Sequence, residues 1–142
     1  DRDSYEFERG RGVGDARGHD VTIVACGLMV AAALEAADAL AASGIEAEVI
    51  NMHTIKPLDA DTLVASARKT GRVVTAEEHS VMGGLGEAVC AALAERCPVP
   101  VRRVGVQDTF GESGPAQELL HKYGLDANGI AAAVHELLHA DA

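Results

Sequence analysis

The segment HELLH at residues 135–139 fits the pattern H-E-x-x-H, which on a helix can bind zinc and supply a general base. On a helical wheel, however, Val134 and Leu137 belong to an apolar face, while His135 and His139 lie towards solvent. A catalytic zinc needs three protein ligands and a water. Only three residues follow the motif in this sequence. We therefore expect an exposed helix end and no metal site.

A second segment that could do chemistry is EEHSVMGGLGEAV at residues 77–89, where a strand enters a glycine-rich turn and then a helix. A helix N-terminus offers backbone amides and a positive dipole end to an anion, so Gly83, Gly84 and Gly86 are candidates for an anion site. Their spacing matches neither the dinucleotide fingerprint nor a P-loop. Glycines also permit a tight turn and close helix packing. We favour this second interpretation, because the acidic residues Glu77 and Glu78 beside the turn repel phosphate.

Further charged residues follow the ends of predicted strands. Glu78 and His79 are interpreted either as an acid–base pair or as a salt-bridging pair at an interface, and we favour the interface because no nucleophile is placed near them. Lys56 is a candidate phosphate ligand or a solvated surface charge. Asp108 follows the end of the fourth predicted strand. Ligands of an open parallel sheet bind beyond the carboxyl ends of its strands, so these residues mark the candidate edge. No complete catalytic constellation is present.

These residues are positioned by alternating strands and helices. Short β-branched apolar runs predict buried strands, and amphipathic or capped segments predict helices, with Asp59 as an N-cap and Gly71 as a stop signal. The predicted strands are 20–26, 45–52, 72–78 and 99–106, and the predicted helices are 28–43, 60–69, 87–96, 117–124 and 128–138. This order predicts an α/β fold, a three-layer α/β/α arrangement around a mostly parallel open sheet.

The composition limits the possible partners. A net charge of −10 argues against binding to nucleic acid or to an anionic membrane. The three cysteines form no C-x-x-C pair, and no uncharged apolar run is long enough to span a bilayer. We therefore expect a cytoplasmic location.

Two parts are predicted along the chain: an N-terminal arm or linker at residues 1–19 and an α/β domain at residues 20–142. The arm is polar and glycine-rich. It nevertheless contains Tyr5 and Phe7, which suggests that it docks on a partner.

Several longer phrases resemble one known family. INMHTIKPLD, VVTAEEHSVMGGLGEAV, RVGVQDTFGESGPAQELLHKYGL and DVTIVACGLMVAAALEAA are similar to the C-terminal domain of transketolase and its thiamin-diphosphate relatives. The resemblance runs from about Tyr5 to Leu138. Residues 110–114, FGESG, look closer to transketolase than to 1-deoxyxylulose-5-phosphate synthase or the beta subunits of 2-oxoacid dehydrogenases.

The resemblance implies a part of a three-domain enzyme. In this family the first domain binds thiamin diphosphate and its Mg through a GDG motif, and the second supplies the catalytic glutamate. This sequence has no GDG; its nearest approach is Gly14-Asp15-Ala16. It also has no counterpart of the second domain. No catalytic or cofactor-binding residue is therefore carried over, and we expect the chain alone to bind no cofactor and to be inactive.

The function that the resemblance implies is a supporting one. The chain would serve as the C-terminal, non-catalytic domain or subunit of an enzyme that transfers a two-carbon ketol unit between sugar phosphates or to a related acceptor. Its expected partners are the thiamin-binding domains or subunits, together with a homodimer contact. Two alternatives stay open: a stand-alone anion-binding or docking module, and the corresponding part of a 2-oxoacid dehydrogenase beta subunit or a 1-deoxyxylulose-5-phosphate synthase.

Overall fold

A computed structural model describes six stretches of the chain: residues 5–9, 19–26, 29–52, 58–77, 84–105 and 127–140. The predicted helix at 117–124 lies outside these residues.

The core of the fold is a five-stranded sheet with the order β1-β3-β2-β4-β5. The neighbouring strands β3, β2, β4 and β5 are parallel, and β1 joins β3 in the antiparallel direction. The strands are β1 (Tyr5–Arg9), β2 (Val21–Ala25), β3 (Ala47–Met52), β4 (Val73–Glu77) and β5 (Val101–Gly105). The predicted mostly parallel open sheet is confirmed, and the four predicted strands coincide with β2 to β5.

Strand β1 was not predicted, because residues 1–19 were read as a polar arm. The structure pairs Phe7 with Ile50 and Glu8 with Val49, so this segment forms one edge of the domain's own sheet. The sequence carries a signal for it: Tyr5 and Phe7 alternate with glutamates, the period-two pattern of a strand. The boundary drawn at residue 19 therefore separates a strand from the sheet to which it belongs.

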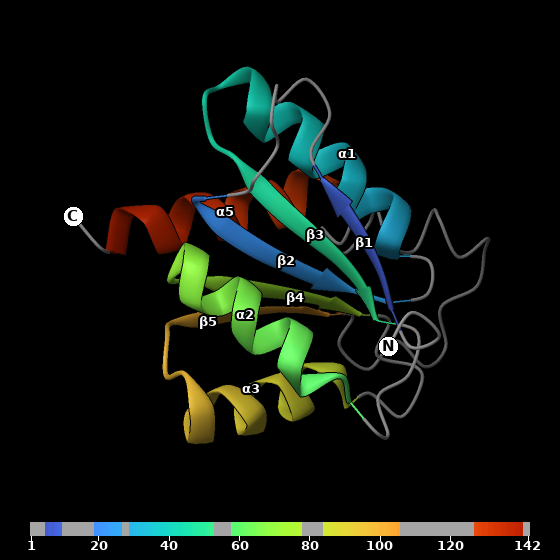
Figure 1. Cartoon of the computed structure of the whole chain (residues 1–142). Helices are drawn as coiled ribbons and strands as arrows, with labels where there is room; N and C mark the ends of the chain where they lie inside the picture. Colours follow the sequence, from blue (N-terminus) through green and yellow to red (C-terminus); the bar gives the residue numbers. More distant parts are fainter. Residues whose placement is uncertain are drawn as a thin grey trace, which may run out of the picture.

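Helices cover both faces of the sheet (Figure 1). The helices α1 (Met29–Ala42) and α5 (Ala127–Ala140) pack on one face, and α2 (Ala60–Thr70) and α3 (Leu85–Arg96) pack on the other. Central strands that are buried on both faces read as continuous apolar runs, as VTIVA in β2 does. The predicted three-layer α/β/α architecture is confirmed. In the described part of the chain, no helix is both long enough and apolar enough to cross a bilayer.

The ends of α2 follow the predicted local signals. The carboxylate of Asp59 accepts hydrogen bonds from the Thr62 amide (3.3 Å) and the Thr62 hydroxyl (3.1 Å), which supplies the N-cap. Gly71 ends the helix with φ +78°, a left-handed conformation that glycine adopts without strain. Local sequence is therefore sufficient to delimit this helix.

Candidate functional site

The carboxyl ends of the four parallel strands, β2 to β5, meet at one edge of the sheet. The register places Ala25 of β2 beside Asn51 of β3 and Ala76 of β4, and it pairs Glu77 of β4 with Gly105 of β5. This is the edge at which ligands of open α/β sheets bind. Five of the candidate site residues lie outside the described residues: Lys56, Glu78, His79, Gly83 and Asp108. The described part of the edge is built by Glu77 and the start of α3.

Glu77 is the last residue of β4, and its side chain is used inside the chain. The residue is 8% exposed. Its Oε1 accepts a hydrogen bond from the Leu85 amide (3.0 Å), and its Oε2 accepts one from the Gly86 amide (2.9 Å). The first amides of a helix have no partner within it, and their positive dipole end favours a negative charge. The helix accordingly begins at Leu85, two residues before the predicted start.

The structure explains why two of the candidate positions, 84 and 86, are occupied by glycine. Gly84 is the N-cap of α3 with φ +99°, a backbone conformation that is strained for residues with a Cβ. At Gly86, an added Cβ would lie 2.5 Å from Nε of Arg103 and 3.2 Å from Oε2 of Glu77. Side chains from β5 and β4 thus converge on the Cα of Gly86. A tight turn and a close approach account for both glycines without a ligand.

The described residues do not form a vacant anion site. An anion at the start of α3 would meet the Glu77 carboxylate on the same two amides. The thiamin diphosphate implied by the resemblance faces the same obstacle, because its diphosphate would also need free amide donors. Within the described stretches, no group of three His, Cys, Asp or Glu side chains could hold a metal. The start of α3, as the structure describes it, therefore does not fit the diphosphate of the cofactor.

The HELLH motif lies on the exposed side of α5, as predicted. His135, Glu136 and His139 are all exposed, while Val134 and Leu137 are buried. Oε1 of Glu136 forms an ion pair with Nε of Arg102 on β5 (3.3 Å), so this carboxylate is directed to a surface arginine. The two imidazole rings stand edge to face, with centroids 6.5 Å apart. The geometry is that of a solvated helix surface.

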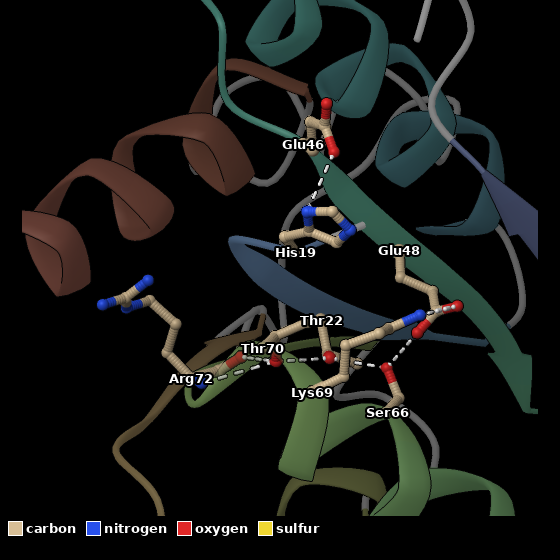
Figure 2. Close-up of polar contacts among 8 residues, drawn as sticks. All are labelled: His19, Thr22, Glu46, Glu48, Ser66, Lys69, Thr70 and Arg72. Carbon is tan, nitrogen blue, oxygen red and sulfur yellow. Dashed lines mark hydrogen bonds and ion pairs between the residues drawn. The ribbon is translucent and has the colours of Figure 1, made fainter. Parts of the chain in front are cut away.

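A buried polar network lies at the opposite edge of the sheet, where the parallel strands begin (Figure 2). The sequence did not reveal it. Glu48 on β3 is fully buried. Its Oε1 accepts a hydrogen bond from the Ser66 hydroxyl (2.5 Å), and its Oε2 forms an ion pair with Nζ of Lys69 (2.8 Å). Both partners come from α2. A buried charge is tolerated when it is paired and hydrogen-bonded in this way, so Glu48 fastens α2 to β3.

The network continues through hydroxyl groups from α2 to β2. Thr22 Oγ1 lies 2.7 Å from Ser66 Oγ and 2.8 Å from Thr70 Oγ1. Ser66 donates its proton to Glu48, and Thr70 donates to the carbonyl of Arg72 (3.0 Å). Each hydroxyl has one proton to donate. The single proton of Thr22 therefore serves only one of its two contacts.

A comparison with known proteins places the chain in a family. The model of the family described as "Transketolase, C-terminal domain" matches residues 10–130. The 6-deoxy-6-sulfo-D-fructose transketolase subunit SqwH of Clostridium sp. (strain MSTE9) is 53% identical over 137 residues, which cover 96% of this chain and 42% of that protein. The 1-deoxy-D-xylulose-5-phosphate synthase 1 of Geobacter sulfurreducens is 45% identical over 142 residues, which cover 99% of this chain and 22% of that protein.

A solved structure agrees with these relatives. It is described as "Split gene transketolase, inactive beta4 tetramer", and it superposes with a TM-score of 0.80 at 59% identity, over 87% of this chain and 40% of that one. The chain thus spans less than half the length of each of these proteins. Because the family model covers most of the chain and the fold agrees, this chain belongs to the transketolase C-terminal domain family.

Proposed function

We propose that the chain is the C-terminal, non-catalytic domain or subunit of a transketolase-type enzyme. The assembled enzyme would transfer a two-carbon ketol unit between sugar phosphates or to a related acceptor. The observation that carries this proposal is the 53% identity to a protein named as a transketolase subunit, in which the matching region is only 42% of the length. A chain of this extent corresponds to one part of such an enzyme.

The role of this part is assembly. Thiamin diphosphate and Mg would be held by other domains or subunits, where they supply the carbanion chemistry of ketol transfer. The occupation of the Leu85 and Gly86 amides by Glu77 supports this division of labour, because these two donors are not available to a diphosphate. Lys56, Glu78, His79, Gly83 and Asp108 follow the strand ends in sequence, and we assign them to the surface that meets the cofactor-binding part. Gly84 and Gly86 shape the start of α3 beside it.

We also propose a homodimer contact and a cytoplasmic location. In the described residues no disulfide joins Cys26, Cys90 or Cys97, which suits a reducing compartment. The relative named as a beta4 tetramer supports self-association of this kind of chain.

A second candidate is the corresponding part of a 1-deoxyxylulose-5-phosphate synthase. The 45% identity to the Geobacter protein over 99% of this chain favours it as the alternative. The two functions differ in the product: the synthase would form 1-deoxyxylulose 5-phosphate, whereas the transketolase would transfer a ketol unit between sugar phosphates. Testing for 1-deoxyxylulose 5-phosphate among the products of the assembled enzyme separates them.

The test is a native mass measurement of the chain with and without the cofactor-binding part of its enzyme, followed by calorimetric titration with thiamin diphosphate. We expect a stable complex, cofactor binding by the complex only, and ketol transfer that depends on this chain. Tight binding of thiamin diphosphate to this chain alone would contradict the proposal, as would a chain that stays separate from the cofactor-binding part.

A further inference from the structure

The hydrogen bonds of Glu77 tie together segments that meet at the proposed assembly edge. The carboxylate leaves the end of β4 and reaches the amides eight and nine residues further along the chain. Residues 78–83, which include the candidates Glu78, His79 and Gly83, lie in sequence between these two tied points. Arg103 of β5 approaches the same place at Gly86. The end of β4 and the start of α3 are therefore fastened at a single carboxylate.

We propose that Glu77 is a positioning residue whose carboxylate acts as a built-in anion, holding the start of α3 in the geometry that the cofactor-binding part recognises. The inference has two halves. The positioning half states that Glu77 holds the start of α3, and it rests only on the contacts of Glu77 within the chain. The assembly half states that the cofactor-binding part recognises this geometry, and it rests on the proposed function.

The chemistry requires a carboxylate at this position. Two converging amides each need an acceptor, and an ionised carboxylate supplies two equivalent oxygens with charge-assisted hydrogen bonds. A glutamine supplies one acceptor oxygen and directs an NH2 donor at the other amide. An alanine leaves both amides without a partner in a buried place, which is unfavourable. Negative charge is also favoured by the dipole of α3, and this contribution is lost in both variants.

The first experiment measures residue-resolved amide hydrogen exchange in Glu77→Gln and Glu77→Ala. The matched control is Glu87→Gln, because Glu87 is an exposed residue of the first turn of the same helix and undergoes the same change in charge. We expect the protection of both the Leu85 and Gly86 amides to fall at least about tenfold in Glu77→Ala, and that of at least one of them to fall by this factor in Glu77→Gln. The protection of both amides should stay unchanged in the control.

A rescue experiment separates an anion-binding role from simple packing. The cavity left by Glu77→Ala should accept a small carboxylate, so we expect sodium formate to restore the protection of the Leu85 and Gly86 amides. Sodium chloride at the same ionic strength should not. Unchanged protection in Glu77→Ala, or equal effects of the two salts, would overturn the positioning role.

The assembly half is tested by the dissociation constant for the cofactor-binding part, measured at a temperature where every variant is folded. We expect about tenfold weaker association for Glu77→Gln, recovery by formate for Glu77→Ala, and wild-type affinity for Glu87→Gln. Wild-type affinity of both Glu77 variants would overturn this half. If the wild-type chain itself does not associate, the proposed function fails together with the assembly half, while amide exchange alone decides the positioning half.

Discussion

Two buried glutamates at opposite edges of the same sheet are compensated in different ways. Glu48, at the amino edge, is held by side chains of α2: the ammonium group of Lys69 and the hydroxyl of Ser66. Glu77, at the carboxyl edge, is held by the backbone amides of Leu85 and Gly86 at the start of α3. The first carboxylate fastens the body of a helix to a strand, and the second fixes the direction in which a helix begins.

We expect the two glutamates to serve different properties of the chain: Glu48 its stability, and Glu77 its association with the cofactor-binding part as well. Changes at the amino edge should lower the free energy of unfolding and leave the affinity for the cofactor-binding part unchanged, as long as the chain is folded. Changes at the carboxyl edge should alter both quantities. The following substitutions test this distinction.

The largest expected effect is that of Lys69→Met. It removes the cation from the fully buried Glu48 carboxylate, and breaking a buried pair costs several kcal/mol. Because the Lys69 side chain is 35% exposed, water screens part of the interaction, and we expect a loss of about 3 kcal/mol in the free energy of unfolding. Urea denaturation measures this quantity.

Two controls accompany that measurement. Arg68→Met removes a positive charge from an exposed position of the same helix and should change stability by less than about 0.5 kcal/mol. The double variant Glu48→Gln/Lys69→Met should be more stable than Lys69→Met, because no buried charge remains. If Lys69→Met and Arg68→Met were equally stable, the ion pair with Glu48 would not hold α2 in place.

An intermediate effect is expected within the hydroxyl chain. Ser66→Ala removes the donor to the Glu48 carboxylate and should lower the free energy of unfolding by about 2 kcal/mol. Thr22→Val keeps the shape of the side chain and leaves the bonds from Ser66 to Glu48 and from Thr70 to Arg72 in place. Since Thr22 has a proton for only one of its two contacts, we expect its loss to cost about 1 kcal/mol or less. A larger effect of Thr22→Val would reverse this order.

A smaller change in stability than that of Ser66→Ala is expected for a pair of glycines that compares the two edges directly. Gly84 at the carboxyl edge has φ +99°, and Gly71 at the amino edge has φ +78°. Alanine is strained at both positions, so each substitution should cost about 1 kcal/mol. Only Gly84→Ala should also weaken association with the cofactor-binding part, as measured by native mass titration. Equal affinities of the two variants would remove the distinction between the edges.

Much of the fold follows from local pattern. The strands β2 to β5 were predicted from short segments rich in β-branched residues, and α2 was delimited by the side chain of Asp59 and the conformational freedom of Gly71. A helix was predicted at 28–43, and α1 buries Met29 and Leu40 of this segment. Each of these signals acts within a few residues of the element that it specifies.

The site was less accessible to prediction. The glycine-rich segment was identified. The positive φ of Gly84 and the close approach of side chains to Gly86 agree with the interpretation that these glycines serve the backbone. The role of Glu77 was missed, because a strand end and a helix start become neighbours only when the chain folds. Glu48 was read as an ordinary strand residue, since nothing in its neighbourhood in sequence indicates that Ser66 and Lys69 approach it.

The sequence by itself determined the order of the elements, the two-sided burial of the central strands and the ends of α2, because local periodicity and capping chemistry act over short distances. The tertiary structure decided the rest. It placed Tyr5–Arg9 on the edge of the sheet, since strand pairing joins residues as distant in sequence as Tyr5 and Met52. It also compensated the charges of Glu48 and Glu77, because a buried carboxylate is stable only where folding brings donors to both of its oxygens.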